Sequence, residues 1–222
     1  MPDTTTLRDL FIEELQDILH GERQLMKALP KMAKAASSPD LRDALQNHLS
    51  ETEEHVARLE QAFDLLDEPA KTKVCAGLQG IIEEGSDTIK QQVKGATLDA
   101  GIIAGGQRAE HYEMAAYGTL IAWAKALGHD DIAALLSDTL QEEKAADEKL
   151  TELAEAGIND AAKSAKASKS PKANGREGNE ADEEDDDEAD TRQGGREMAM
   201  SGKKTTHKSE SRSQKSKARS HR

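Results

Sequence analysis

Apolar side chains recur at intervals of three or four residues along the first 157 residues of this 222-residue chain. This spacing gathers them on one face of an α-helix, whereas a strand requires alternation with period two, which no stretch sustains for long. The pattern therefore predicts an all-α fold with four long helices. They begin near Thr6, Ser38, Thr97 and Asp130, and the third ends at Gly128.

The connections between these predicted helices differ in length. A few residues around Ser38 separate the first helix from the second, and Pro39 and Asp40 there are typical of a first helical turn. Gly128 and His129 alone separate the third helix from the fourth, whereas residues 70–96 form a long connection with one more helix inside it. A short, a long and a short connection predict two antiparallel hairpins joined by one crossover, which is the ferritin-like four-helix bundle.

The end of the chain is too polar to join this bundle. Hydrophobic residues make up only 36% of the chain and charged residues 33%. The first 160 residues carry 31 acidic and 15 basic side chains, whereas the tail has an acidic run at 182–188 and then 10 basic and 2 acidic residues at 191–222. Such charge blocks bury too little apolar area to offset ordering entropy. The sequence predicts a folded unit at 6–157 and a disordered tail, first acidic and then basic, at 161–222.

Several classes of protein are excluded by the same features. The longest apolar stretches, 101–104 and 120–124, are far too short to span a membrane. The first residues have neither the basic nor the apolar region of a secretory signal. The single cysteine, Cys75, cannot form an internal disulfide. We therefore expect a cytoplasmic protein with no membrane partner.

Acidic and imidazole side chains interrupt the apolar face of every long helix. In the first helix, Glu22 lies in register with Ile18 and Leu25. The candidate metal ligands found in this way are Glu22 in the first helix, His48, Glu51 and His55 in the second, Glu110 and Glu113 in the third, and Glu143 and Asp147 in the fourth. Each helix thus places at least one carboxylate near its middle on the inner face.

Carboxylates in a bundle interior must be paired, protonated or bound to a cation. No lysine or arginine lies on the same faces of the first three helices at that depth. Oxygen ligands with one or two imidazoles suit iron or manganese, so the pattern predicts two such ions. Any one of these residues alone would more often lie on a solvated flank; the coincidence in four helices is what favours a metal.

Four segments of the folded unit occur in an order and at separations that match a known family. They are Leu10-Phe11 with Asp17 and Glu22-Arg23-Gln24-Leu25, His48-Leu49-Ser50-Glu51-Thr52, Ala109-Glu110-His111-Tyr112-Glu113 with Ala116-Tyr117-Gly118-Thr119-Leu120, and Leu140-Gln141-Glu142-Glu143-Lys144-Ala145-Ala146-Asp147. These segments resemble the bacterial YciF/YciE stress-protein family over about residues 6–157. The resemblance implies a ferritin-like fold similar to rubrerythrin-type di-iron bundles and a stress-induced protein that is often a homodimer.

The resemblance also implies roles for the candidate ligands. By position, Glu22 would match the carboxylate of the first helix, Glu51 the bridging carboxylate of the second, Glu110 and Glu113 the E-x-x-E pair of the third, and Glu143 the carboxylate of the fourth. The second helix departs from the usual E-x-x-H pattern, with His48 three residues before Glu51 and His55 four residues after it. The fourth helix has Asp147 and no histidine. The numbers of imidazole ligands and of ions stay open at this stage.

Two functions fit these observations. The first is a stress-response protein in which a di-iron or di-manganese centre, bridged by Glu51 and Glu143, reacts with peroxide or dioxygen. The second is a non-catalytic scaffold whose basic tail, with residues such as Lys203 and Lys204, contacts nucleic acid or another polyanion. For the tail we favour a simpler role in solubility, because a bundle this acidic repels nucleic acid.

Overall fold

The computed structural model describes residues 5–91 and 93–165. The helices in these ranges are α1 (Leu7–Ala35), α2 (Pro39–Leu65), α3 (Ala76–Lys90), α4 (Ala96–Leu127), α5 (Asp130–Leu153), a π-helical turn η1 (Ala154–Ile158) and α6 (Asn159–Ser164). The described residues contain no strand. The predicted all-α fold is therefore confirmed for this part of the chain.

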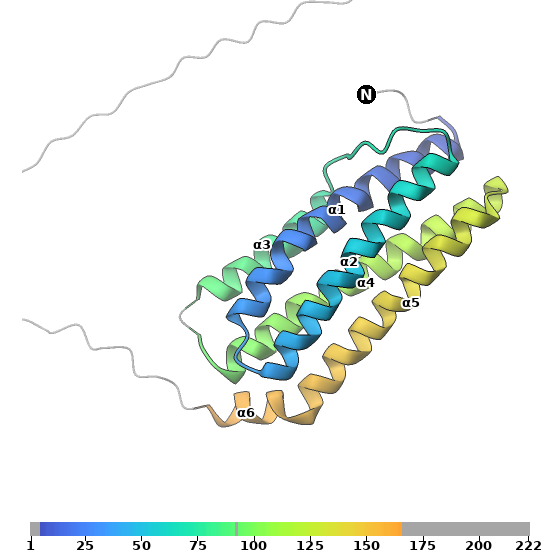
Figure 1. Ribbon diagram of the computed structural model, residues 1–222. Coiled ribbons are helices and arrows are strands. Elements are labelled where there is room, and N and C mark those ends of the chain that lie inside the picture. The colour runs from blue at the N-terminus through green and yellow to red at the C-terminus, as the bar shows by residue number, and fades with distance from the viewer. Residues whose placement is uncertain (1–4, 92, 166–222) are drawn as a thin grey trace, which may run out of the picture. The chain divides into compact units, whose positions relative to one another are not determined.

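The long helices form two antiparallel hairpins that pack against each other. In Figure 1, α1 and α2 make the first hairpin and α4 and α5 the second, and α2 lies against α5 while α1 lies against α4. Helices α2 and α4 run in the same direction, so the chain between them crosses the length of the bundle. Helix α3 lies within this crossover and packs on α1 and α4. The predicted ferritin-like bundle, with one crossover and an extra helix in it, is confirmed.

Local hydrogen bonds define where these helices begin. The Thr6 hydroxyl accepts from the Asp9 amide at 3.1 Å, and the Asp9 carboxylate accepts from the Thr6 amide at 3.0 Å, which is a capping box. The carboxylate of Asp99, near the start of α4, accepts from the amides of Ser37 and Ser38 at 2.7 and 2.9 Å. This buried side chain therefore ties the start of α4 to the turn before α2.

Glycines allow two of the helix pairs to approach closely. A Cβ atom on Gly77 of α3 would lie 2.5 Å from the ring of Tyr112 on α4, and a Cβ atom on Gly106 of α4 would lie 2.9 Å from a methyl of Leu150 on α5. The first glycine lets α3, the helix in the crossover, lie directly against α4. The second brings α4 and α5 together at the level of the polar cluster described below.

Helical structure extends beyond the predicted end at residue 157. Gly157 has a φ of 150°, a backbone conformation that favours glycine, and the chain then enters α6. Because α6 contacts α4, residues 161–164 belong to the bundle and not to the predicted tail. The rest of that tail, and with it the predicted disorder and basic segment, lies outside the described residues. No described helix is long and apolar enough to cross a membrane.

The bundle interior consists of two apolar layers with a polar layer between them. Along α1, Phe11 and Leu15 precede Glu22, and Leu25 and Leu29 follow it, and all five side chains are buried. Neighbouring helices follow the same order, so apolar packing encloses the polar layer from both ends of the bundle. This enclosure keeps water from both ends of the central layer.

Candidate metal centre

Six acidic and imidazole side chains from four helices make up the polar layer. They are Glu22 on α1, His48 and His55 on α2, Glu110 and Glu113 on α4, and Glu143 on α5. None of them is more than 6% exposed. All six were candidate ligands in the sequence, and the fold brings them to one depth in the bundle.

Five of these residues form two groups that could each hold a metal ion. In the inner group (Glu22, His55 and Glu143), one ligand atom from each residue lies within 4.8 Å of the others. In the outer group (His48, Glu110 and Glu143), the three ligand atoms also lie within 4.8 Å of one another. Because Glu143 belongs to both groups and has two carboxylate oxygens, it can serve two ions at once.

The two histidines face the layer with one ring nitrogen each. In His48, Nε2 lies 3.4 Å from Oε1 of Glu110 and 3.8 Å from Oε2 of Glu143. In His55, Nδ1 lies 3.0 Å from Oε1 of Glu143 and 3.6 Å from Oε1 of Glu22, although neither contact has the geometry of a hydrogen bond.

The other nitrogen of each ring contacts a carboxylate outside the layer. Nδ1 of His48 donates to Glu51 at 3.3 Å, and Nε2 of His55 donates to Glu142 at 3.0 Å. Arg58 donates in turn to both oxygens of Glu142. A carboxylate that accepts from one ring nitrogen determines which nitrogen is left for a metal, and this arrangement is common around metal-bound histidines.

Most of the carboxylate oxygens in the layer have no hydrogen-bond partner. The buried side-chain atoms that lack a hydrogen bond are Oε2 of Glu22, Nδ1 of His55, Oε2 of Glu110, both oxygens of Glu113, both oxygens of Glu143 and Oδ1 of Asp147. Among the described residues, no lysine or arginine forms an ion pair with the four buried glutamates. Unpaired buried polar atoms are costly, and divalent cations would satisfy this set of oxygen and imidazole donors.

The pKa values of the metal-free layer also favour a cation site. Burial raises the pKa of Glu22, Glu110 and Glu113, and the neighbouring Glu143 raises each of these pKa values further. Burial lowers the pKa of His55, but the carboxylates of Glu143 and Glu22 outweigh this effect and raise it to about 10. Burial likewise raises the pKa of Glu143, but His55 and Glu110 outweigh it, so this pKa is lowered. The metal-free layer thus retains protons that cations would displace.

Tyr117 adds a neutral donor to the inner group. Its hydroxyl donates to Oε1 of Glu22, and its ring packs edge-on against His55 with the ring centroids 6.4 Å apart. The side chain is fully buried, and burial and the Glu22 carboxylate raise its pKa well above the usual value. The tyrosine therefore stays protonated and orients Glu22.

Three predicted ligands lie outside the two groups. Glu51 has a side chain that is 45% exposed and contacts His48 from outside, so the residue that both groups share is Glu143 alone. Asp147 is 22% exposed, and its Oδ2 lies 3.4 Å from Nε2 of His111. Glu113 is fully buried between Glu110 and Tyr117 on α4 but belongs to neither group.

Sequence reasoning missed the outer ion pair of Arg58 and Glu142. Arg58 follows His55 by three residues and Glu142 precedes Glu143 by one, so both border the predicted ligands. An arginine one helical turn from a buried histidine, opposite an acidic helix, was the signal that could have indicated this pair.

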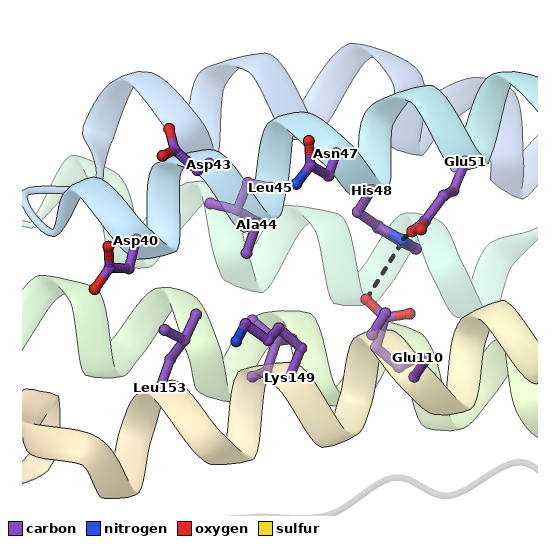
Figure 2. A pocket seen from close by; sticks show the side chains of 13 residues that line it. Asp40, Asp43, Ala44, Leu45, Asn47, His48, Glu51, Glu110, Lys149 and Leu153 are labelled. Atoms are coloured by element: carbon purple, nitrogen blue, oxygen red, sulfur yellow. Dashed lines mark hydrogen bonds and ion pairs between the residues drawn. The ribbon is translucent and has the colours of Figure 1, made fainter.

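A groove between α2 and α5 reaches the outer group from the surface. Its volume is about 450 Å³. Figure 2 shows His48 and Glu110 at its inner end and Glu51 beside them, with Asp40 and Asp43 farther along α2. The groove touches none of Glu22, His55 and Glu143. The two groups therefore differ in access. His48 and Glu110 of the outer group line a groove that is open to the surface, whereas no residue of the inner group lines it.

Comparisons with known proteins identify the family of the chain and agree with its fold. The profile of a domain of unknown function, DUF892, matches residues 6–163. Protein YciF of Escherichia coli strain K12 is 41% identical over 160 residues, which are 72% of this chain and 96% of YciF. The crystal structure of the E. coli stress protein YciF matches with a TM-score of 0.68 over 70% of this chain and 98% of that chain, at 41% identity. YcfI from Rhodopseudomonas palustris matches with a TM-score of 0.66 over 68% of this chain and 96% of that chain, at 45% identity.

Proposed function

We propose that this chain, which belongs to the DUF892 family of YciF-like stress proteins, binds two iron or manganese ions. These ions would react with peroxide or dioxygen. The chain's resemblance to that family, first seen in four sequence segments, is confirmed. The observation that carries the proposal is the position of Glu143, whose carboxylate belongs to both ligand groups. One bridging carboxylate between two sets of donors is the arrangement of ferritin-like di-metal bundles.

The donor atoms support hard or borderline divalent metals. Three carboxylates and two imidazoles lie within the two groups, and no described cysteine belongs to them. Such ligands suit iron and manganese better than metals that prefer thiolates. When bound, iron or manganese would supply redox chemistry toward peroxide or dioxygen.

The chain's own residues prepare the site for that chemistry. His48 and His55 are held with one nitrogen inward by Glu51 and Glu142. The buried carboxylates provide negative charge that favours the more highly charged oxidation state of a bound metal. Apolar layers at both ends limit access by water, so the groove is the opening through which an oxidant would reach the outer group.

Two further parts of the proposal follow from the family and the composition. We expect the protein to act in the cytoplasm and to form a homodimer. Size measurement of the purified full chain tests the second expectation, since a monomer at all concentrations would contradict it.

The metal site is tested by counting ions. We expect the full chain, loaded with Fe(II) or Mn(II) without oxygen and then desalted, to retain two ions per chain by elemental analysis. Glu143→Gln should lose both ions, because it removes ligand charge from both groups. Glu148→Gln is the matched control, since it makes the same change at an exposed position of α5.

The outcomes separate the two functions considered above. Wild-type protein that retains no ion, or Glu143→Gln protein that retains two, would contradict the proposal and leave the bundle as a scaffold. If two ions bind, mixing with hydrogen peroxide or dioxygen should oxidise them, which optical absorbance can follow. Bound ions that resist both oxidants would retain the metal site and reject the redox reaction.

A further inference from the structure

We propose that the groove between α2 and α5 is the entry path for hydrated divalent cations, and that the outer group loads first and passes an ion to the enclosed inner group. This inference rests on the proposed function, because it assigns a route and an order to the same centre. It adds a role for Asp40, Asp43 and Glu51, which contribute no ligand to either group.

The inner end of the groove is a buried pair with an unsatisfied oxygen. His48 is 6% exposed and Glu110 is 3% exposed, and both line the groove. Oε2 of Glu110 is buried without a hydrogen-bond partner. The groove thus ends at donor atoms that a cation would satisfy, and these atoms belong to the outer group.

The groove has room for an ion that still carries water. Each water occupies about 30 Å³ in the liquid, so a shell of six fills roughly 180 Å³. The groove, at about 450 Å³, accommodates such an ion with space to spare. Removing the water of a divalent cation costs free energy, so a path that admits the hydrated ion avoids that cost until ligands replace the water.

The charge along the groove favours cations. Asp40, Asp43 and Glu51 lie along its α2 side, and none of them pairs with a lysine or arginine in the part of the chain that the structure describes. Lys149 is the one basic residue among the lining residues, and its Nζ lies 3.1 Å from Glu152 on the same helix, which offsets its charge. Acidic walls next to a low-dielectric interior raise the local concentration of cations.

Glu51 lies where the groove meets the outer group. Its side chain is 45% exposed, yet its Oε2 is 3.3 Å from Nδ1 of His48. Figure 2 shows its carboxylate beside the His48 ring and at the same end of the groove as Glu110. A half-exposed carboxylate one helical turn from His48 can hold an incoming ion before His48 and Glu110 replace its water.

Another cavity also touches His48 and Glu110, but it does not suit a cation. It has a volume of about 30 Å³, and its walls include Leu25, Leu29 and Ile82. This space holds about one water, and apolar walls offer a hydrated ion no compensation for lost water. Of these two cavities, the acidic groove is therefore the one that fits the charge and size of the ion.

The order of loading follows from burial. Glu22, His55 and Glu143 are each 0% exposed and line neither cavity. An ion that enters through the groove meets His48 and Glu110 first, and Glu143 then connects the outer group to the inner group. We therefore expect uptake in two phases, a fast phase at the outer group and a slow phase at the inner group.

Blocking the groove tests the route. Co(II) serves as the probe, because its absorbance reports coordination in a stopped-flow experiment on the full chain. Ala145→Trp adds bulk to an exposed lining residue of α5, and Ala134→Trp, exposed on the same helix and away from the groove, is the control. We expect Ala145→Trp to slow uptake roughly tenfold or more while two ions still bind at equilibrium. Equal rates for both variants and the wild type would overturn the route.

Charge and order are tested with two more variants and a control. Asp43→Asn should slow uptake severalfold at low salt and little at high salt, whereas Asp64→Asn, exposed on α2 outside the groove, should not. Glu22→Gln should remove the slow phase and keep the fast one. Loss of the fast phase in Glu22→Gln, or equal salt effects in both aspartate variants, would contradict the inference.

These outcomes are distinct from a failure of the metal site itself. If the wild type takes up no Co(II), Fe(II) or Mn(II), the proposed function fails and no route is needed. If the wild type binds two ions but the groove variants behave like their controls, the metal site stands and only the route is rejected.

Discussion

Nε2 of His55 on α2 lies 3.0 Å from Oε2 of Glu142 on α5. Because a carboxylate accepts, this contact keeps a proton on Nε2 and leaves Nδ1 facing Glu143, 3.0 Å away. Arg58 donates to both oxygens of Glu142, and this contact lowers the pKa of that carboxyl. A half-buried ion pair between two helices therefore orients a fully buried candidate ligand.

Glu142→Gln is expected to weaken metal binding without removing a ligand. The amide can present its NH₂ to Nε2, which favours the tautomer with the proton on Nδ1, the nitrogen that faces the centre. Loss of such a partner typically costs about tenfold to a hundredfold in metal affinity. Competition with a chelator measures the change, and Glu148→Gln on the same helix is the control. Unchanged affinity in Glu142→Gln would show that the contact does not orient His55.

Tyr117→Phe should destabilise the metal-free protein more than the metal-loaded protein. The tyrosine hydroxyl donates to Glu22, and both side chains are fully buried. Removing the donor leaves the carboxyl without that partner and should lower the free energy of unfolding by about 1–3 kcal/mol. A bound cation would take over this role, so urea unfolding with Mn(II) present should show a smaller difference. Equal losses with and without Mn(II) would place the ion away from Glu22.

The metal-free protein should become less stable as pH rises from about 5 to 9. The pKa values of Glu22, Glu110 and Glu113 are raised above 4.5, so the folded chain keeps protons there that the unfolded chain releases. His55 adds stability that is fully present below pH 6.5 and is lost as pH rises toward about 10. Both effects have the same sign, because the folded state binds more protons than the unfolded state.

The opposite shift of Glu143 does not reverse this trend. Its pKa is lowered, so it contributes stability above 4.5 that is lost only as pH falls below that value. Urea unfolding at several pH values, with and without Mn(II), measures the dependence. Added Mn(II) should stabilise the protein most at the upper end of the range, since binding requires deprotonated ligands. Stability of the metal-free chain that rises between pH 5 and 9 would contradict the protonated layer.

Gly77→Ala and Gly80→Ala should have opposite effects on stability, although both lie on α3. A Cβ atom at Gly77 would meet the Tyr112 ring at 2.5 Å, so this change should cost about 1–3 kcal/mol. A Cβ atom at Gly80 meets nothing within 4 Å, so alanine there should stabilise the helix by roughly 0.5–1 kcal/mol. Thermal unfolding compares the two. A stabilising Gly77→Ala would mean that α3 does not press on α4 in solution.

Local spacing was enough to predict the helices and their order. Three-or-four periodicity, the helix start near Thr6 and the glycine at position 128 depend only on neighbouring residues, and each is found at a helix end or on a buried face. Helix α6 was missed because its six residues carry little apolar periodicity, and its contact with α4 is a tertiary one.

Helical periodicity is a property of one segment at a time, so the order of residues was enough to predict an acidic, all-α bundle with carboxylates and histidines on the inner helix faces. Which atoms meet depends on how the helices pack. Glu143 and Glu142 are neighbours in sequence, yet one is shared by both ligand groups and the other holds His55 from outside. Glu51, one turn from His48, borders the groove instead of the interior. Which side chains of a helix face the interior depends on its rotation about its own axis, and packing against the other helices sets that rotation.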